Sequence, residues 1–326
     1  MKTITFIVNP ISGRSKKARI PSLVNSRLDK TLFEPEIIYT EYAGHAAEIA
    51  AECAKRGRDV VVAVGGDGTV NEVAGALIHT DTALAIIPCG SGNGLARHLQ
   101  IPLTAPEAID IINKNTVHTL DYGKLNDKPF FCTCGVGFDA FLSQKFAEAG
   151  KRGFVTYLEK SLTDGLRYKP ETYSLQVDDD DSHPQDAFVI ACANASQYGN
   201  NAMIAPQASM KDGLLDIVII EPFHMIESGQ VAWQLFQGTL KKNSHVKTFH
   251  AKKLHISRKE DGPVHCDGEP FITNKDVDIE IVPLGINVVV NPDAKGHNEN
   301  GLKLIGEYFM TWHKATKEMV DKVFKK

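Results

Sequence analysis

The stretch GGDGT, residues 65–69, places an acid and a hydroxyl among three glycines. It follows an apolar run, Val60 to Val64, and a helix-like pattern opened by Asn71 and Glu72 comes after it. Glycines at the end of a strand let main-chain N–H groups approach an anion, and a helix N-terminus adds partial positive charge. A tight turn that requires positive φ would explain one or two of the glycines, but not the whole combination. The stretch therefore predicts a phosphate-binding loop.

Two other glycine-containing loops have the same character. Residues 9–13 read NPISG and precede a cationic helix start, and residues 88–94 read PCGSGNG. Each loop alone is also typical of an ordinary turn. A dinucleotide fingerprint fits GGDGT poorly, because GxGxxG would need glycine at Asn71, and no lysine follows to make it a Walker loop.

The elements that must position these loops alternate between strand and helix. Strands are expected at residues 4–8, 36–40, 60–64 and 84–88, and helices at 16–28, 45–56, from 71, near Leu95 and at 106–113. Such alternation predicts a parallel sheet covered on both faces. All three loops would then lie at the carboxyl edge of one sheet, where open α/β sheets bind ligands.

The second half of the chain has a mainly β texture. Strands are expected at 130–138, 172–177, 187–195, 214–220, 253–257, 277–282 and 286–290, with helices at 154–166 and 226–239. This pattern favours an antiparallel, two-layered β domain. We expect an α/β domain over residues 1–122, a β-sandwich over 123–295 and an amphipathic C-terminal helix over 296–326.

Composition narrows the class of protein. A chain of 326 residues with 43% hydrophobic residues can bury a full core, and its formal charge of −4 gives no general attraction to nucleic acid. Its six cysteines form no CxxC pair, which favours free thiols in a reducing compartment. The N-terminal apolar run reaches Asn9 and Pro10 at once, and no window approaches 18 apolar residues. We therefore expect a cytoplasmic protein that binds no nucleic acid.

The C-terminal tail, residues 301–326, has apolar residues at helical spacing with lysines around them. Such a helix packs on its own protein or on a second subunit, which would make a homodimer. Aromatic residues flanked by lysines also suit a helix that lies in a membrane interface. Both readings stay open, and the second would give peripheral contact with a membrane.

Taken together, the motifs resemble a known family. NPxSG at 9–13, Thr40 with GHA at 44–46, GGDGTVNE at 65–72, PxGSGN at 88–93 and DGE at 267–269 look like the lipid kinases of the diacylglycerol kinase and sphingosine kinase type, particularly their small soluble bacterial members. The resemblance implies a nucleotide domain related to NAD kinases and phosphofructokinases, followed by a β-sandwich. It also implies transfer of the ATP γ-phosphate to a lipid hydroxyl between them.

The resemblance assigns the ATP contacts residue by residue to Asn9, Ser12, Gly13, Thr40, Gly65, Gly66, Asp67, Gly68, Thr69, Val70, Asn71 and Ser91. These positions offer N–H groups and hydroxyls to phosphates, and Asp67 supplies a hard oxygen suited to Mg²⁺. Residues 90–94 read GSGNG where the bacterial diacylglycerol kinases tend to read GTAND, which is nearer to the sphingosine kinase pattern. The acceptor is therefore left open between diacylglycerol and a sphingoid or related lipid.

Two acids two residues apart, Asp267 and Glu269, complete the expected catalytic set with Asp67. Alone, Asp267-Gly268 reads as a hairpin turn. With the resemblance, we expect Glu269, assisted by Asp267, to orient the acceptor hydroxyl and take its proton. The alternative, in which Asp67 is the base, stays open.

A structural Mg²⁺ is a further implication of the resemblance. The expected ligands are the Asp212 side chain and the main-chain carbonyls of Ser209 and Leu214, with waters completing the shell. Read without the family, Lys211-Asp212-Gly213 is a turn.

The expected function is a MgATP-dependent lipid kinase that meets its substrate at a membrane surface. Two alternatives remain. One is a kinase on the same nucleotide fold that phosphorylates NAD, and the other is a catalytically silent lipid-binding or regulatory protein.

Overall fold

Runs of β-branched and apolar residues form four parallel strands in the first part of the chain: β1 (Lys2–Val8), β2 (Phe33–Tyr39), β3 (Val60–Gly65) and β4 (Ala83–Pro88). The computed structural model describes residues 1–11, 19–148 and 168–294. The strands lie in the order β2-β1-β3-β4, and every residue of β3 and β4 is buried. The expected parallel sheet is therefore confirmed.

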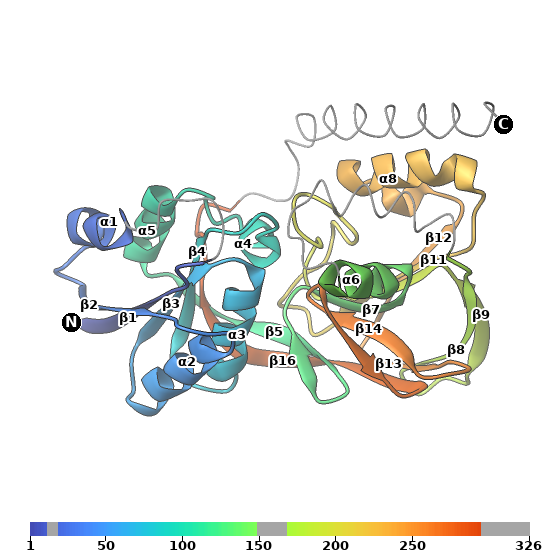
Figure 1. Ribbon diagram of the computed structural model, residues 1–326, viewed down its shortest axis with the longest axis horizontal. Coiled ribbons are helices and arrows are strands. Elements are labelled where there is room, and N and C mark those ends of the chain that lie inside the picture. The colour runs from blue at the N-terminus through green and yellow to red at the C-terminus, as the bar shows by residue number, and fades with distance from the viewer. Residues whose placement is uncertain (12–18, 149–167, 295–326) are drawn as a thin grey trace.

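Among the described residues, five helices accompany these strands: α1 (Ile20–Arg27), α2 (His45–Lys55), α3 (Asp67–Leu77), α4 (Gly94–His98) and α5 (Ala105–Lys114). Helices α2 and α3 pack together on one face of the sheet, and α1 and α5 lie on the other (Figure 1). Helix α3 begins at Asp67, four residues earlier than the sequence pattern indicated, because Gly66 is its N-cap and its carbonyl accepts the Val70 N–H. The acid of GGDGT is therefore part of the first helical turn.

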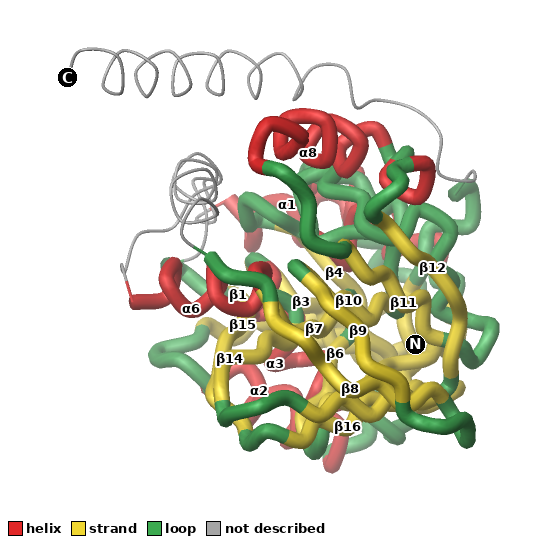
Figure 2. The backbone as a smooth tube through the Cα atoms, turned by 90° about the vertical axis from the view of Figure 1, so that its right-hand side faces the viewer, coloured by secondary structure: helices red, strands yellow, loops and turns green. Residues whose placement is uncertain are grey.

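In the ranges that the structure describes, twelve further strands build the second lobe: β5 (Val117–Leu125), β6 (Lys128–Phe130), β7 (Thr133–Gly137), β8 (Glu171–Val177), β9 (His183–Ala187), β10 (Val189–Ala193), β11 (Leu215–Ile220), β12 (Val246–Ala251), β13 (Lys253–Ser257), β14 (Gly262–Cys266), β15 (Glu269–Thr273) and β16 (Asp276–Val289). Six of them form an antiparallel sheet in the order β12-β11-β10-β7-β14-β15. Figure 2 shows the backbone of these strands gathered in one lobe. Side chains from the six-stranded sheet and from β5, β6, β8, β13 and β16 share one apolar core. The expected β-sandwich is confirmed.

Two α-helices and two short 3₁₀ segments complete the described part of the second lobe: α6 (Phe138–Glu148), α8 (Ser228–Gln237), η2 (Met225–Glu227) and η3 (Leu240–Lys242). Helix α6 packs against β14 and β15, and the sequence pattern had assigned its first residue to a strand. The expected helix at 154–166 and the tail at 296–326 lie outside the described residues. Among the described helices, none has the length and apolar character needed to cross a membrane.

Strand β16 joins the two lobes. The two strands expected at 277–282 and 286–290 form this one long strand, with an irregularity between Val282 and Ile286. Its last part pairs in parallel with β4 through Val288 and Leu84, so the ten-stranded sheet runs from one lobe into the other (Figure 1). Ile286 and Val288 consequently lie in the core of the first lobe. A division of the chain at residue 122 stays a prediction.

Candidate active site

The loops after β1 and β3 meet at the carboxyl edge of the parallel sheet. Asn9 donates from Nδ2 to Thr69 Oγ1 over 3.1 Å, and its main-chain N–H bonds the Val64 carbonyl. Thr40, at the end of β2, is buried and donates its N–H to the Val8 carbonyl. These expected ATP-binding residues therefore share one edge. Two others, Ser12 and Gly13, lie outside the described residues, and Ser91 is exposed in the loop after β4.

The glycines of the loops after β3 and β4 allow close approach of the two main chains, and none of them has left-handed backbone. Gly66 has a φ of −91°, so the interpretation of this stretch as a turn requiring positive φ is wrong for that residue. A methyl group on Gly90 would lie 2.7 Å from Gly66 Cα, and one on Gly65 would lie 2.5 Å from the Thr69 side chain. The loops after β3 and β4 can touch only because neither carries a side chain at the contact.

The N-terminus of α3 is available to an anion. Within the part of the chain that the structure describes, no side chain caps this helix at Gly66. The N–H groups of its first turn have no acceptor within the helix, and they add to the positive end of the helix dipole. Such an end is a natural phosphate site. Val70 turns its side chain into the core and bonds Gly66 through its N–H, while Asn71 is half-buried.

Asp67 links the loops after β3 and β4. Its Oδ2 accepts the Asn93 N–H over 2.9 Å and its Oδ1 accepts the Gly94 N–H over 2.7 Å, so the carboxylate caps α4. A methyl group on Gly92 would lie 2.8 Å from Asp67 Oδ2. Each carboxylate oxygen keeps lone-pair capacity beyond its one hydrogen bond, which fits a hard cation such as Mg²⁺ as a further ligand.

Arg97 also binds the loop after β4, and no signal in the sequence singled it out. Its Nε donates to the Gly92 carbonyl over 2.9 Å, and its two terminal nitrogens reach Asn201 Oδ1 and Asn200 Oδ1, at 3.1 and 3.4 Å. Burial lowers the pKa of Arg97 below its usual value, and the nearby Asp67 carboxylate offsets only part of this shift. The guanidinium thus joins the loop of the first lobe to a loop of the second.

Glu72, the last residue of the GGDGTVNE motif, contacts the GHA motif at residues 44–46 directly. From α3 it accepts the N–H groups of Gly44 at Oε1 and Ala46 at Oε2, over 3.0 and 3.1 Å, at the N-terminus of α2. Glu72 therefore caps α2 and fixes the segment that follows Thr40. We expect its role to be structural.

In the second lobe, Asp267 and Gly268 form the two-residue turn between β14 and β15. Their φ values are +50° and +81°, and Cys266 pairs with Glu269 across the turn. Left-handed backbone at both positions is typical of a tight hairpin turn and favours Asp-Gly. The hairpin turn expected from this fragment is therefore observed, and the catalytic role of the two acids stays a prediction.

The Asp267 carboxylate points into its own lobe. Its Oδ2 accepts the Phe131 N–H over 2.8 Å, and its Oδ1 accepts those of Cys132 and Thr133 over 2.7 and 2.9 Å. Burial raises the pKa of Asp267 to about 6, although the three N–H donors act in the opposite direction. This acid fastens the turn to the main chain that leads into β7.

Glu269 points toward the first lobe. A methyl group on Gly68 would lie 3.2 Å from Glu269 Oε1. Gly68 directly follows Asp67 in the first turn of α3, so the Glu269 carboxylate, from the second lobe, reaches the helical turn that begins with Asp67. Of the three acids that the sequence indicated, Asp67 and Glu269 therefore lie at this end of α3, and Asp267 supports the β14–β15 turn.

The expected structural metal ligands lie together in the loop before β11. Asp212 Oδ1 accepts the Leu214 N–H over 3.1 Å, and the buried Asp121 fixes the loop by accepting the Gly213 N–H over 2.9 Å. One carboxylate and two carbonyls form an all-oxygen donor set that fits Mg²⁺. No cluster of three or more His, Cys, Asp or Glu side chains suited to a metal occurs in the described ranges. The site at Ser209, Asp212 and Leu214 stays a prediction.

Comparisons with known families cover most of the chain. The Diacylglycerol kinase catalytic domain matches residues 3–125, and the YegS C-terminal NAD kinase beta sandwich-like domain matches residues 133–290. A probable lipid kinase YegS-like from Pectobacterium atrosepticum is 30% identical over 261 residues, which are 77% of this chain and 84% of that protein. A diacylglycerol kinase from Mycobacterium tuberculosis is 27% identical over 88% of this chain and 94% of its own length.

Solved structures agree in fold. A crystal structure of a diacylglycerol kinase from Bacillus anthracis is 22% identical, with a TM-score of 0.68 over 89% of this chain and 97% of that one. An NAD kinase from Archaeoglobus fulgidus in complex with ATP is 13% identical, with a TM-score of 0.50 over 95% and 99% of the two chains. Both likenesses concern the fold alone, and they agree with the NAD kinase-like architecture expected from the sequence.

Proposed function

The chain belongs to the family of small bacterial lipid kinases with a diacylglycerol kinase catalytic domain and a YegS-type β-sandwich, and from this premise we propose that it transfers the γ-phosphate of ATP to a lipid hydroxyl. We propose diacylglycerol as the first acceptor to test, because relatives of this chain are named diacylglycerol kinases. A sphingoid lipid is the second, because residues 90–94 read GSGNG.

The approach of Glu269 to the first turn of α3 carries this proposal. Phosphoryl transfer needs a site for the phosphates and a group that orients the attacking hydroxyl and accepts its proton. The uncapped N-terminus of α3 supplies the first, and Glu269 Oε1, 3.2 Å from the position of a methyl group on Gly68, supplies the second. A hydroxyl that donates to Glu269 would lie beside the phosphates bound at this helical turn.

Different residues of the chain would carry the separate parts of the reaction. Main-chain N–H groups at the start of α3 bind the phosphates, Asn9 and Thr69 shape the edge beside them, and Glu269 takes the proton of the acceptor hydroxyl. Asp67, oriented by the N–H groups of Asn93 and Gly94, is the side chain that would hold the nucleotide's Mg²⁺. When bound, this cation offsets the negative charge of the phosphates.

The acceptor's chemistry also sets where the enzyme works. A diacylglycerol is held in a bilayer, so the protein must visit a membrane surface to reach it. We propose peripheral contact of this kind, and we leave the association of two copies as a separate question for the tail at residues 296–326.

The test is a phosphorylation assay with purified protein, labelled ATP and Mg²⁺. Diacylglycerol, sphingosine, ceramide, monoacylglycerol and phosphatidylglycerol are presented in mixed micelles, and NAD is added in a separate arm. Label in diacylglycerol or another lipid supports the proposal. Label in NAD alone would replace it with an NAD kinase, and ATP binding without transfer to any acceptor would indicate a silent regulatory protein.

A further inference from the structure

Behind the β14–β15 turn lies a chain of three polar side chains, the half-buried Tyr198 and the buried Asp139 and His265, which we call the turn network. The imidazole of His265, on β14, lies with Nε2 3.0 Å from Asp139 Oδ2, and the Tyr198 hydroxyl donates to the same oxygen over 3.0 Å. The side chains of His265 and Asp139 are only 1% and 9% exposed. A polar cluster at this depth is costly unless each member has its partner, so its geometry is tightly defined.

The far side of the imidazole reaches the turn itself. His265 Nδ1 accepts the Gly268 N–H over 3.3 Å. Because a main-chain N–H can only donate, Nδ1 carries no proton, and the ring proton lies on Nε2 and points at Asp139. Asp139 Oδ1 in turn accepts the Ala140 N–H at the start of α6. The ring therefore spans the distance from α6 to the residue that precedes Glu269.

The other end of the turn network is attached to the nucleotide side of the site. Asn200, two residues after Tyr198, donates its N–H to the Gly92 carbonyl over 3.0 Å. A methyl group on Gly199 would lie 3.1 Å from Gly92 Cα, so the two loops are in close contact. The neighbouring Asn93 N–H is the one that orients Asp67. One continuous set of contacts thus runs from the loop that orients Asp67 to the turn that carries Glu269.

We propose that His265 and Asp139 are positioning residues for phosphoryl transfer: they hold the Asp267-Gly268 turn so that the Glu269 carboxylate stays against the first turn of α3. This inference rests on the proposed function and adds to it the residues that aim the proton acceptor. Neither side chain needs to touch ATP or lipid, because the effect passes through Gly268. Misplacement of a reacting group by about 1 Å can cost up to 10²-fold in rate, so loss of either residue should slow transfer.

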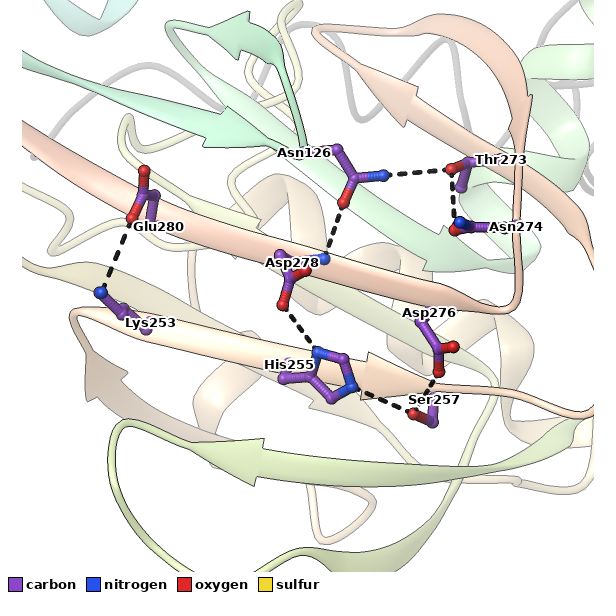
Figure 3. A network of polar contacts seen from close by, with 9 residues as sticks. All are labelled: Asn126, Lys253, His255, Ser257, Thr273, Asn274, Asp276, Asp278 and Glu280. Carbon is purple, nitrogen blue, oxygen red and sulfur yellow. Dashed lines mark hydrogen bonds and ion pairs between the residues drawn. The ribbon is translucent and has the colours of Figure 1, made fainter.

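The test is a double-mutant cycle between His265→Gln and Glu269→Gln in the full-length protein, measured as the single-turnover rate of lipid phosphorylation with calorimetric ATP affinity alongside. His265→Gln should slow transfer by about tenfold or more in the wild-type background, with ATP affinity unchanged. In the Glu269→Gln background it should change the rate by less than about twofold, because the group it positions is already lost. His255→Gln is the matched control: this histidine also pairs with an aspartate, but on the exposed face of β13 and β16 (Figure 3), and its loss should leave the rate unchanged.

Several outcomes would overturn the inference. An equal slowing by His265→Gln in both backgrounds, or a loss of ATP affinity, would show a general structural role, and a wild-type rate would show no role at all. Asp139→Asn, which keeps the shape of the side chain, must show the same dependence on Glu269, and this variant decides the question if His265→Gln does not fold. Wild-type protein that phosphorylates no lipid overturns the proposed function itself, whereas active wild type with additive variants overturns the inference alone.

Discussion

Among the histidine–aspartate pairs of the described second lobe, two have very different surroundings. In the turn network the side chains of His265 and Asp139 are 1% and 9% exposed, whereas those of His255 and Asp278 are 37% and 76% exposed. Figure 3 shows the second pair within a row of polar side chains on β13 and β16, which also contains Lys253, Ser257, Asp276 and Glu280. We call this row the strand-face network.

Helix α6 makes the difference between the two pairs. Along β13, Leu254 and Ile256 point into the core and His255 points outward, as the period of a strand requires. On β14, Val264, His265 and Cys266 are all buried, because α6 packs over the outer face of this strand. Water competes for the hydrogen bonds of an exposed pair such as His255 and Asp278, so that pair adds little stability. Water does not reach the buried pair of His265 and Asp139, so loss of one member leaves the other without a hydrogen-bond partner.

The strand-face network also shows why residue types alone do not define a catalytic site. Asp278, His255 and Ser257 form a hydrogen-bonded series, with His255 Nδ1 2.7 Å from Asp278 Oδ1 and Nε2 3.1 Å from Ser257 Oγ. The Ser257 hydroxyl, however, donates to Asp276 Oδ1 over 2.7 Å. Its proton is directed away from the histidine, so we assign no nucleophile here.

The largest difference in stability is expected between an aspartate of the β14–β15 turn, Asp267, and an aspartate of the strand-face network, Asp278. Asp267→Asn places an amide among three N–H donors, so at least one donor loses its acceptor whichever way the amide is turned, and we expect the free energy of unfolding to fall by about 2–3 kcal/mol. Asp278→Asn, on the strand face, should cost less than about 1 kcal/mol. Urea unfolding at pH 7 measures both variants. Equal losses would mean that the turn is no better fixed than the exposed row.

A glycine pair on α3 tests whether the turn network aims Glu269 at this helix. Gly68→Ala sets a methyl group 3.2 Å from Glu269 Oε1, whereas a methyl group on Gly75 of the same helix meets nothing within 4 Å. We expect Gly68→Ala to slow phosphate transfer by about tenfold through displacement of the carboxylate, and Gly75→Ala to transfer at the wild-type rate. Initial rates of lipid phosphorylation at saturating ATP decide. Matching rates for the two variants would separate Glu269 from α3.

A further expected effect is a pH dependence of the free energy of unfolding that comes from Asp267 in the turn. Because burial raises the pKa of Asp267 from 3.8 to about 6, the folded protein binds more protons than the unfolded chain between these values. The free energy of unfolding should therefore fall as pH rises from about 4 to about 6, by at most about 1.4 kcal/mol per pH unit from this group. The difference between wild type and Asp267→Asn, from urea unfolding at several pH values, isolates this contribution. A difference that is constant over this range contradicts the raised pKa.

Much of the first lobe followed from local pattern. The β-branched runs at 4–8, 60–64 and 84–88 became the central strands because their residues suit burial on both faces of a parallel sheet. The helix start at Asp67 did not follow, since the three glycines of GGDGT disfavour helix by intrinsic propensity. Here the contact of Gly66 with Gly90 and the Asp67 bonds to the next loop outweigh that propensity.

The contacts of the second lobe that matter most for the site could not be predicted from the sequence. Nothing in the sequence distinguishes His265 from His255, because burial by α6 depends on packing between segments more than 100 residues apart. The return of β16 to β4 through Val288 is likewise a long-range pairing that periodicity does not report. The hairpin at Asp267-Gly268 could be predicted because its turn chemistry is local, and the role of DGE came from the resemblance to lipid kinases. The side chains that hold the turn could not be predicted either way.

The most direct test of the account is the proton acceptor itself, measured as single-turnover transfer from labelled ATP to the lipid that the panel identifies. Glu269→Gln should keep ATP affinity while the rate falls by ~10²-fold or more. Glu280→Gln, which removes an exposed carboxylate 3.9 Å from Lys253 Nζ on the strand face, should transfer at the wild-type rate. Asp67→Asn should weaken Mg²⁺-dependent ATP binding as well as turnover. A Glu269→Gln protein with near wild-type turnover, beside an Asp67→Asn protein that binds MgATP normally but transfers nothing, would contradict the account and make Asp67 the base.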